Sequence, residues 1–140
     1  MRQSLLDNLT DDLGRITGIL PGGTATGPRL HPGERRDVAV LFLDISGFTA
    51  LAERLDFELV HHLVNGIMQA CSGIVSGGGG YVDKLEGDRI MALFGAEQAG
   101  DNDSVRAVDS ALRMMSALEQ VNEMLAGEGI KVEARAVVSY

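Results

Sequence analysis

The chain has 140 residues, of which 45% are apolar and 23% are charged, which is enough for one globular domain with a buried core. Its net charge is −8, and no run of lysine or arginine is longer than the pair Arg35–Arg36, so we expect no nucleic-acid surface. The one cysteine, Cys71, excludes an internal disulfide and a cysteine-based zinc site, and is typical of a reducing compartment.

The sequence also argues against insertion into or passage across a membrane. No apolar run approaches the roughly 18 to 20 residues that a membrane-spanning helix needs. The N-terminal segment carries Asp7, Asp11 and Asp12 where a signal peptide would be apolar. We therefore expect a cytoplasmic protein without a membrane span.

The N-terminal 36 residues divide into a helix and a linker. One apolar seam, with leucine or isoleucine at every third or fourth position, predicts an amphipathic helix over residues 1–20. The seam consists of Leu6, Leu9, Leu13, Ile16 and Leu20. Such a helix would suit docking on its own domain as well as dimerisation or signal transmission. All three prolines and four glycines lie between residues 21 and 33, which predicts a linker over 21–36 and a folded domain over 37–140.

The first half of this domain reads as a strand, a helix and a hairpin. The run VAVLFL, residues 38–43, is continuously apolar, as in a central strand covered on both faces. Residues 56–76 carry a helical stripe and predict a long amphipathic helix. The stripe consists of Leu59, Val60, Leu63, Val64, Ile67, Cys71, Ile74 and Val75. The glycines at 77–80 end this helix, and YVDKL and RIMALF then predict a hairpin that turns at residues 86–88.

The second half reads as a helix and a final strand. Asn102, Asp103 and Ser104 offer capping side chains for a helix. Its expected buried face consists of Val105, Val108, Leu112, Met115, Leu118, Val121 and Leu125. Residues 130–140 alternate between apolar and polar, which predicts a half-buried strand. The order β, α, β, β, α, β predicts an α+β fold of the ferredoxin-like or palm type, with an antiparallel sheet and its helices on one face.

Two aspartates stand out within this pattern. Asp44 directly follows the apolar strand and has no cation in the next nine residues, so its partner must come from elsewhere in the chain. Asp88 lies at the hairpin turn, and a hairpin beside the first strand would bring it close to Asp44. Either residue alone is more often a turn or helix cap. Two carboxylates without a neighbouring His or Cys suit Mg²⁺ or Mn²⁺ bound jointly with phosphates.

The segment after Asp44 adds a second feature. Residues 45–49, ISGFT, predict a turn into a helix whose free backbone amides suit phosphate oxygens, and Gly47 would allow a close approach. The glycine run at 77–80 is not followed by Gly-Lys-Ser/Thr, so it is interpreted as a flexible connection and not as a phosphate-binding loop. His61 and His62 lack the spacing of metal ligands.

Taken together, VAVLFLDISGFTALAERL and GGYVDKLEGDRIMALFGA resemble the signature of class III adenylate and guanylate cyclase catalytic domains. The resemblance covers about residues 37–140 and keeps the predicted order of elements. It implies a two-metal mechanism, in which one of two Mg²⁺ or Mn²⁺ ions activates the ribose 3′-hydroxyl and the other grips the triphosphate.

The resemblance also implies roles for single residues. Asp44 and Asp88 match the two metal-binding aspartates, and Ile45 matches the position that adds a backbone carbonyl to one metal. The amides of Ser46, Gly47, Phe48 and Thr49 match the turn that contacts the phosphates. Lys84 falls where adenylate cyclases carry a lysine that reads the adenine ring, which favours ATP over GTP as substrate. Glu86 departs from the small or apolar residue usual before the Gly-Asp pair.

Length is the larger departure, because members of the family continue for about 60 to 80 further residues that supply a second base-reading residue and the groups that stabilise the transition state. Family active sites form at a head-to-tail dimer interface, so the resemblance implies a homodimer. We therefore expect a truncated cyclase domain that binds metal but has little or no activity by itself. The alternative is a regulatory cyclase-like module that binds nucleotide, metal or a partner without turnover.

Three other readings fit the sequence less well. A phosphatase of the haloacid dehalogenase type needs a second aspartate two residues after the first and a threonine four residues after it, where this chain has Ser46 and Phe48. A diguanylate cyclase needs GG(D/E)EF at the hairpin turn, where this chain has EGD. A purely structural dimerisation module would explain the N-terminal seam but not Asp44 and Asp88.

Overall fold

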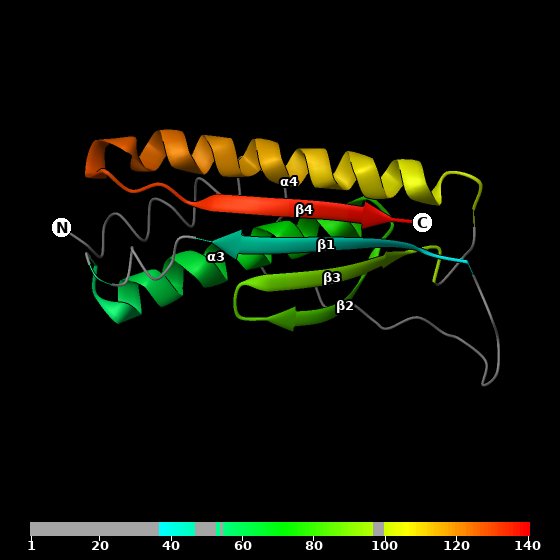
Figure 1. The fold of residues 1–140 in the computed structure, drawn as a ribbon, viewed down its shortest axis with the longest axis horizontal. Coiled ribbons are helices and arrows are strands. Elements are labelled where there is room, and N and C mark those ends of the chain that lie inside the picture. The colour runs from blue at the N-terminus through cyan, green and yellow to red at the C-terminus, as the bar shows by residue number, and fades with distance from the viewer. Residues whose placement is uncertain (1–36, 47–52, 54, 97–99) are drawn as a thin grey trace.

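The computed structural model describes residues 37–46, 53, 55–96 and 100–140, so the expected N-terminal helix and linker lie outside the described residues. The described elements follow the predicted order (Figure 1). They are β1 (Ala39–Ser46), α3 (Phe57–Gly77), β2 (Tyr81–Glu86), β3 (Arg89–Phe94), α4 (Asp103–Leu125), a short 3₁₀ helix (Ala126–Glu128) and β4 (Glu133–Ser139). In the described part of the chain, no helix combines the length and the apolar character needed to cross a bilayer.

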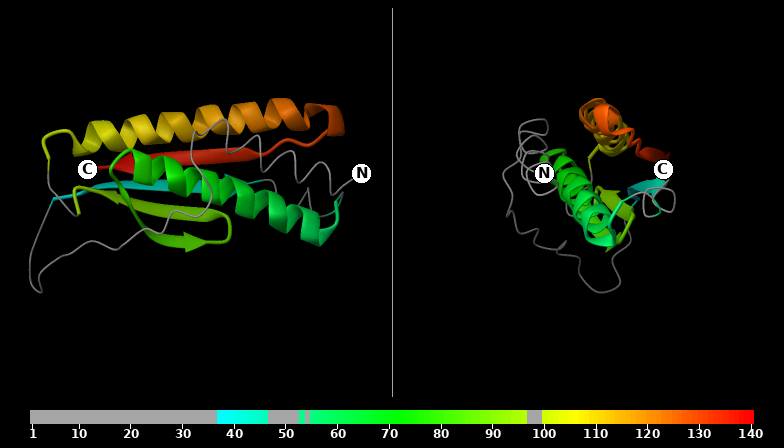
Figure 2. Two further views of the ribbon diagram at one scale, coloured as in Figure 1. Left: turned by 180° about the vertical axis from the view of Figure 1, so that it is seen from behind. Right: turned by 90° about the vertical axis from the view of Figure 1, so that its left-hand side faces the viewer.

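The four strands form one antiparallel sheet in the order β2-β3-β1-β4. Both long helices lie on the same side of this sheet, as the views from behind and from the side show (Figure 2). This arrangement confirms the predicted α+β fold with helices on one face. It leaves the other side of the sheet uncovered within the described chain, and we call that side the open face.

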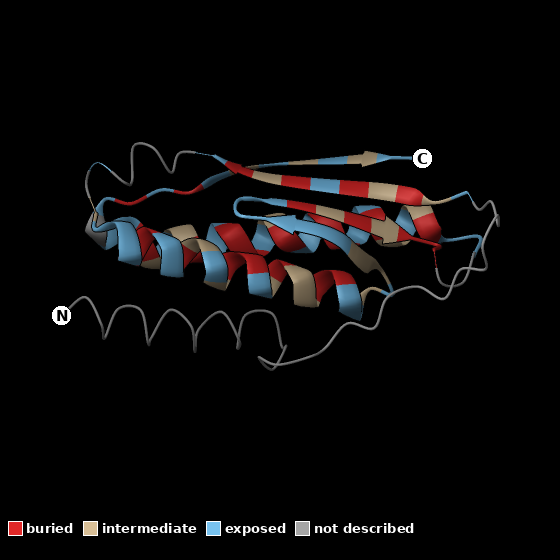
Figure 3. Ribbon diagram, turned by 90° about the horizontal axis from the view of Figure 1, so that it is seen from below, coloured by how far each residue is buried: buried red, intermediate tan, exposed pale blue. Residues whose placement is uncertain are grey.

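The alternation of burial along β1 follows from this one-sided arrangement (Figure 3). Ala39, Leu41, Leu43 and Ile45 point toward the helices and are buried. The residues between them lie on the open face, where 45% of Phe42 is exposed. The prediction that β1 is covered on both faces was therefore wrong for the described chain, because both helices pack on one side.

The long helix α3 confirms its predicted stripe. Seven of the eight predicted positions are buried, Val64 is half-buried, and Met68 joins the core. Burial raises the pKa of the Cys71 thiol to about 12, because the thiolate would lose its hydration in the apolar interior. Cys71 is therefore a protonated core residue.

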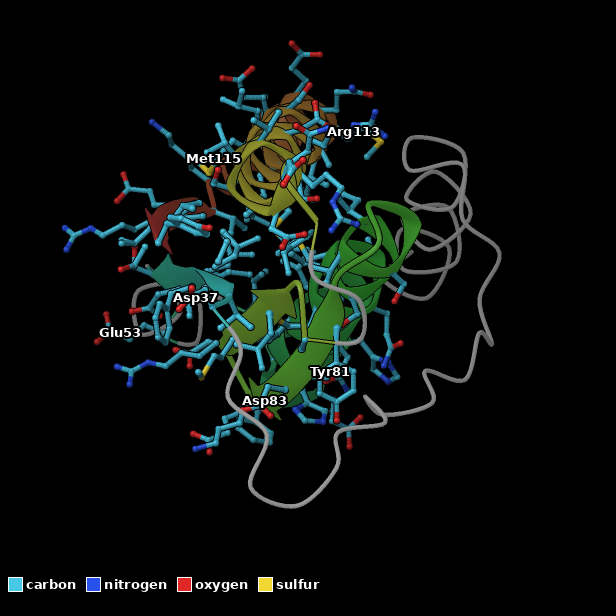
Figure 4. The ribbon with its side chains drawn as sticks, turned by 90° about the vertical axis from the view of Figure 1, so that its right-hand side faces the viewer. Asp37, Glu53, Tyr81, Asp83, Arg113 and Met115 are labelled. Atoms are coloured by element: carbon cyan, nitrogen blue, oxygen red, sulfur yellow. The ribbon has the colours of Figure 1, made fainter. Side chains whose placement is uncertain are left out.

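The second helix, α4, buries a different face from the one predicted. Val105, Val108 and Leu112 are exposed, whereas Leu118, Val121 and Leu125 are buried as expected. In the first half of the helix the core-facing residues are small or flexible. They are Ala107, Ser110, Ala111 and Met114. Short side chains let this end of the helix approach the sheet closely, so the neighbouring stripe of valine and leucine is left outside. Met115 is half-buried on the side of β4, and Arg113 projects the other way (Figure 4).

The glycines after α3 make a packed connection. A Cβ at Gly80 would lie 2.7 Å from two ring carbons of Phe94 and 2.9 Å from a methyl carbon of Val75. Only a residue without a side chain fits between the helix end and the sheet. The run interpreted as a flexible connection therefore places β2 tightly against the core.

Candidate metal and nucleotide site

Asp44 lies near the end of β1 on the open face, with half of its side chain exposed. In the sheet register it is opposite Arg89 on β3 and Arg135 on β4. Residues opposite each other in antiparallel strands share a face of the sheet. Asp44 is thus a surface carboxylate held on a rigid central strand, with a cationic residue on each side.

Asp88 is positioned by the hairpin that joins β2 to β3. The loop contains only Gly87 and Asp88, and Gly87 has a φ of 52°, which matches the type II′ turn that requires glycine at its first central position. The Asp88 carbonyl accepts a hydrogen bond of 2.9 Å from the Ile45 amide. The backbone of Asp88 is therefore fixed beside the residue that follows Asp44.

Ile45 has its side chain in the core, with 1% exposed. Only its backbone is available to the open side, which is compatible with the carbonyl role implied by the family resemblance. Ser46 is exposed, and its hydroxyl donates to the Glu133 carbonyl at 3.5 Å. Gly47, Phe48 and Thr49, the rest of the expected phosphate-contacting turn, lie outside the described residues.

Lys84 comes from β2, two strands away from Asp44. The register shifts between Val82 and Lys84, so that Val82 is opposite Ala92 and Lys84 is opposite Met91. Met91 is in turn opposite Phe42, which places Lys84 on the open face with Asp44. The irregularity falls at Asp83, on the outer strand of the sheet (Figure 4). Without it, Lys84 would alternate onto the helix-covered face.

Sequence reasoning missed the cation that accompanies Asp44. The Arg89 Nε atom lies 3.8 Å from an Asp44 carboxylate oxygen, and both side chains are at least half exposed. The residues that follow Asp44 along the chain carry no cation up to position 53, whereas Arg89 comes from the neighbouring strand. The signal was present, because Arg89 follows Asp88 directly and begins the strand that pairs with β1.

The donor set fits a divalent ion that is shared with a phosphate ligand. Within the described residues, no group of three or more His, Cys, Asp or Glu side chains is arranged to hold a metal ion. Asp44 and Asp88 supply hard oxygen donors, but too few to complete a shell. Mg²⁺ commonly binds through one or two carboxylates and completes its shell with water and substrate phosphates. The chemistry of these two donors is thus compatible with a metal ion that also binds phosphate oxygens.

Comparison with known proteins decides the family. The family model described as the adenylate and guanylate cyclase catalytic domain matches residues 30–134. The chain belongs to this family. Its antiparallel sheet with two helices is therefore the fold of part of a cyclase domain.

Named relatives differ in the base of their substrate. An adenylate cyclase of Anabaena cylindrica is 31% identical over 63% of this chain and 16% of its own length. A cytidylate cyclase of Escherichia coli is 32% identical over 71% of this chain and 23% of its own length. Identity alone therefore does not select the base.

The solved structures that match this chain also include cyclases for different bases. The adenylyl cyclase CyaB from P. aeruginosa matches with a TM-score of 0.66 at 31% identity, over 72% of this chain and 54% of that one. The guanylyl cyclase Cya2 matches with a TM-score of 0.64 at 31% identity, over 76% of this chain and 56% of that one. The chain thus spans about half the length of these solved relatives, and a smaller share of the curated ones.

Proposed function

We propose that this chain is the metal-binding part of a nucleotide cyclase that converts ATP to cyclic AMP and pyrophosphate. The observation that carries the proposal is that the backbone of Asp88 lies beside the end of β1, next to Asp44. The Ile45 amide and the Asp88 carbonyl are joined by a hydrogen bond, so the two carboxylates belong to adjacent backbone positions on neighbouring strands. Membership of the cyclase family supports the assignment of this pair to metal binding.

Each residue has a separate task in this proposal. Asp44 and Asp88 hold two Mg²⁺ or Mn²⁺ ions with help from the Ile45 carbonyl, and residues 46–49 contact the phosphates through backbone amides. When bound, such ions supply Lewis acidity for the 3′-hydroxyl and neutralise charge on the triphosphate. Strand β1 fixes the backbone of Asp44 and the hairpin turn fixes that of Asp88, which limits the entropic cost of orienting the two carboxylates.

The choice of ATP rests on Lys84, which shares the open face with Asp44. We expect Lys84→Glu to reduce the preference of the chain for Mn²⁺·ATP over Mn²⁺·GTP by about 10-fold to 150-fold, because a charge-assisted hydrogen bond contributes roughly 1.5 to 3 kcal/mol. Titration calorimetry with both nucleotides measures this ratio. Lys131→Glu is the matched control, since it makes the same charge change at an exposed site before β4. An unchanged ratio in Lys84→Glu would mean that the base is read elsewhere.

We further propose that the active form is a homodimer and that the 140-residue chain alone has little activity. Exposed Phe42 and Val137 on the open face support a partner subunit on that side. The chain spans only about half of the solved cyclase chains, which supports the low activity proposed for these 140 residues alone. A longer natural form, incubated with Mn²⁺ and ATP or GTP, should form cyclic nucleotide, and Asp44→Ala should abolish this activity. A longer form that binds nucleotide but forms no product would favour a regulatory module.

A further inference from the structure

A row of alternating charges crosses the open face at the level of Asp44. Glu86 on β2 is opposite Arg89 on β3, Arg89 is opposite Asp44 on β1, and Asp44 is opposite Arg135 on β4. The side chains of such a row share one face. The candidate metal-binding carboxylate is therefore the centre of a continuous charged band.

Within this band the described ion pair is between Arg89 and Asp44. Their closest atoms, Nε and an Oδ atom, are 3.8 Å apart, and 71% and 50% of the two side chains are exposed. Exposed pairs with this geometry contribute roughly 0 to 1 kcal/mol. Arg89 therefore neutralises Asp44 without holding it firmly, and the pair separates at little cost.

The charges around the site favour a metal–phosphate complex over a free metal ion. Asp44, Asp88 and Glu86 bring three negative charges, and Arg89 and Arg135 bring two positive ones, so the arginines offset most of the carboxylate charge. A free dication is attracted to the carboxylates but repelled by the arginines. A divalent ion bound to a triphosphate is anionic, and its phosphate oxygens match guanidinium groups well.

We propose that Arg89 is a positioning residue that exchanges partners when the site fills. In the empty site, the Arg89 guanidinium pairs with Asp44. When the Asp44 carboxylate binds a divalent ion, Arg89 is released and pairs with triphosphate oxygens. This inference rests on the proposed metal-binding role of Asp44 and Asp88. It gives Arg89 opposite effects on two ligands, which a purely structural ion pair would not have.

Arg89→Ala is the main test, with two probes that contain no nucleobase. We expect the variant to bind Mn²⁺ alone about threefold to tenfold more tightly than the parent chain, because a competing and repelling charge has been removed. We expect it to bind Mn²⁺ with inorganic triphosphate about tenfold more weakly, because a charge-assisted contact is lost. Titration calorimetry on the 140-residue chain measures both affinities.

Three further variants make the test specific. Arg113→Ala removes an equally exposed arginine from an ion pair on α4 and should change neither affinity. Arg135→Ala removes the other cation beside Asp44 and should change both affinities less than Arg89→Ala does. Arg89→Lys keeps the charge and should restore most of the triphosphate affinity. Thermal unfolding monitored by circular dichroism should give similar midpoints for all of these variants, since each change is at the surface.

The outcomes separate this inference from the proposed function. Suppose that Asp44→Asn removes Mn²⁺ binding, but that Arg89→Ala changes the affinities for Mn²⁺ and for Mn²⁺ with triphosphate in the same direction or leaves both unchanged. The proposed exchange by Arg89 is then wrong, and the proposed metal site is kept. If Arg135→Ala and Arg89→Ala changed both affinities equally, the effect would come from the summed positive charge and not from a specific contact of Arg89. That result would also overturn the exchange by Arg89. A parent chain that binds no Mn²⁺ with or without triphosphate would overturn both.

Discussion

Asp103 is a charged residue in the core, with 3% of its surface exposed. Its carboxylate accepts a hydrogen bond of 2.9 Å from the Gly100 amide and pairs with Arg106 one turn later in α4. The bond from Gly100, aided by Arg106, lowers the pKa of Asp103 although burial acts in the opposite direction. The expected cap from Asn102 is absent, since its side chain makes no capping hydrogen bond. Asp103 thus secures the start of α4 by binding the loop in front of it.

The lowered pKa predicts acid sensitivity. A carboxylate whose pKa is lower in the folded state stabilises the protein above its unfolded pKa of about 3.9, and this contribution is lost as pH falls through the folded pKa. We expect Asp103→Asn to lower the free energy of unfolding at pH 7 by about 1 to 3 kcal/mol. The variant should also lose less stability than the parent between pH 5 and pH 3. Urea unfolding across this pH range measures both effects.

Asp109→Asn is the control for this prediction, because Asp109 also pairs with an arginine of α4 but at the surface. It should change stability at pH 7 by less than about 0.5 kcal/mol. Equal losses from both substitutions would show that burial of Asp103 is unimportant.

In the β2–β3 hairpin, the backbone conformation of Gly87 determines where Asp88 lies. Gly87 adopts a positive φ that a β-branched residue strongly disfavours, although no heavy atom lies within 4 Å of a Cβ placed there. We expect Gly87→Val to cost about 1 to 3 kcal/mol of stability through backbone strain and to weaken Mn²⁺ binding by displacing Asp88. Denaturant unfolding and calorimetry measure these effects. Gly127→Val, at an equally open site without positive φ, should leave Mn²⁺ affinity unchanged.

The helix α4 shows where prediction from sequence reaches its limit. Periodicity correctly placed the helix, but the segment carries two faces that could pack, one with Val105, Val108 and Leu112 and one with alanines and Met114. Hydrophobicity favours the first face. Packing selects the second, because small side chains allow the helix axis to approach the sheet. The spacing of apolar residues in the sequence does not reveal how closely the helix axis approaches the sheet.

The candidate site was predictable to a similar extent. Asp44, Asp88 and their proximity followed from the order of elements, because consecutive strands of a hairpin tend to lie beside an earlier strand. Arg89 as the partner of Asp44 required the register, and the position of Lys84 required a strand irregularity that leaves no clear mark in the sequence. Long-range pairing is fixed by the whole sheet, so single-strand patterns do not specify it.

At the scale of the whole molecule, a strand edge and an apolar stripe are both open among the described residues. Among the described strands β4 is at an edge of the sheet, and the half-buried Met115 of α4 lies on the side of β4 (Figure 4). The exposed stripe on α4 consists of Val105, Val108 and Leu112. Unpaired strand edges and apolar patches both promote association between copies of a chain.

This arrangement predicts that association between copies of the chain depends on ionic strength. A net charge of −8 keeps copies apart by long-range repulsion, which acts over about 10 Å at 0.1 M salt and about 3 Å at 1 M salt. Contacts through apolar surface are not screened in this way. We expect light scattering to show a second virial coefficient that is positive in dilute buffer and negative near 1 M salt. The double variant Val108→Lys with Leu112→Lys lowers the magnitude of the net charge. It should nevertheless keep the chain dispersed at high salt, because it removes the apolar contacts that dominate once salt screens the repulsion.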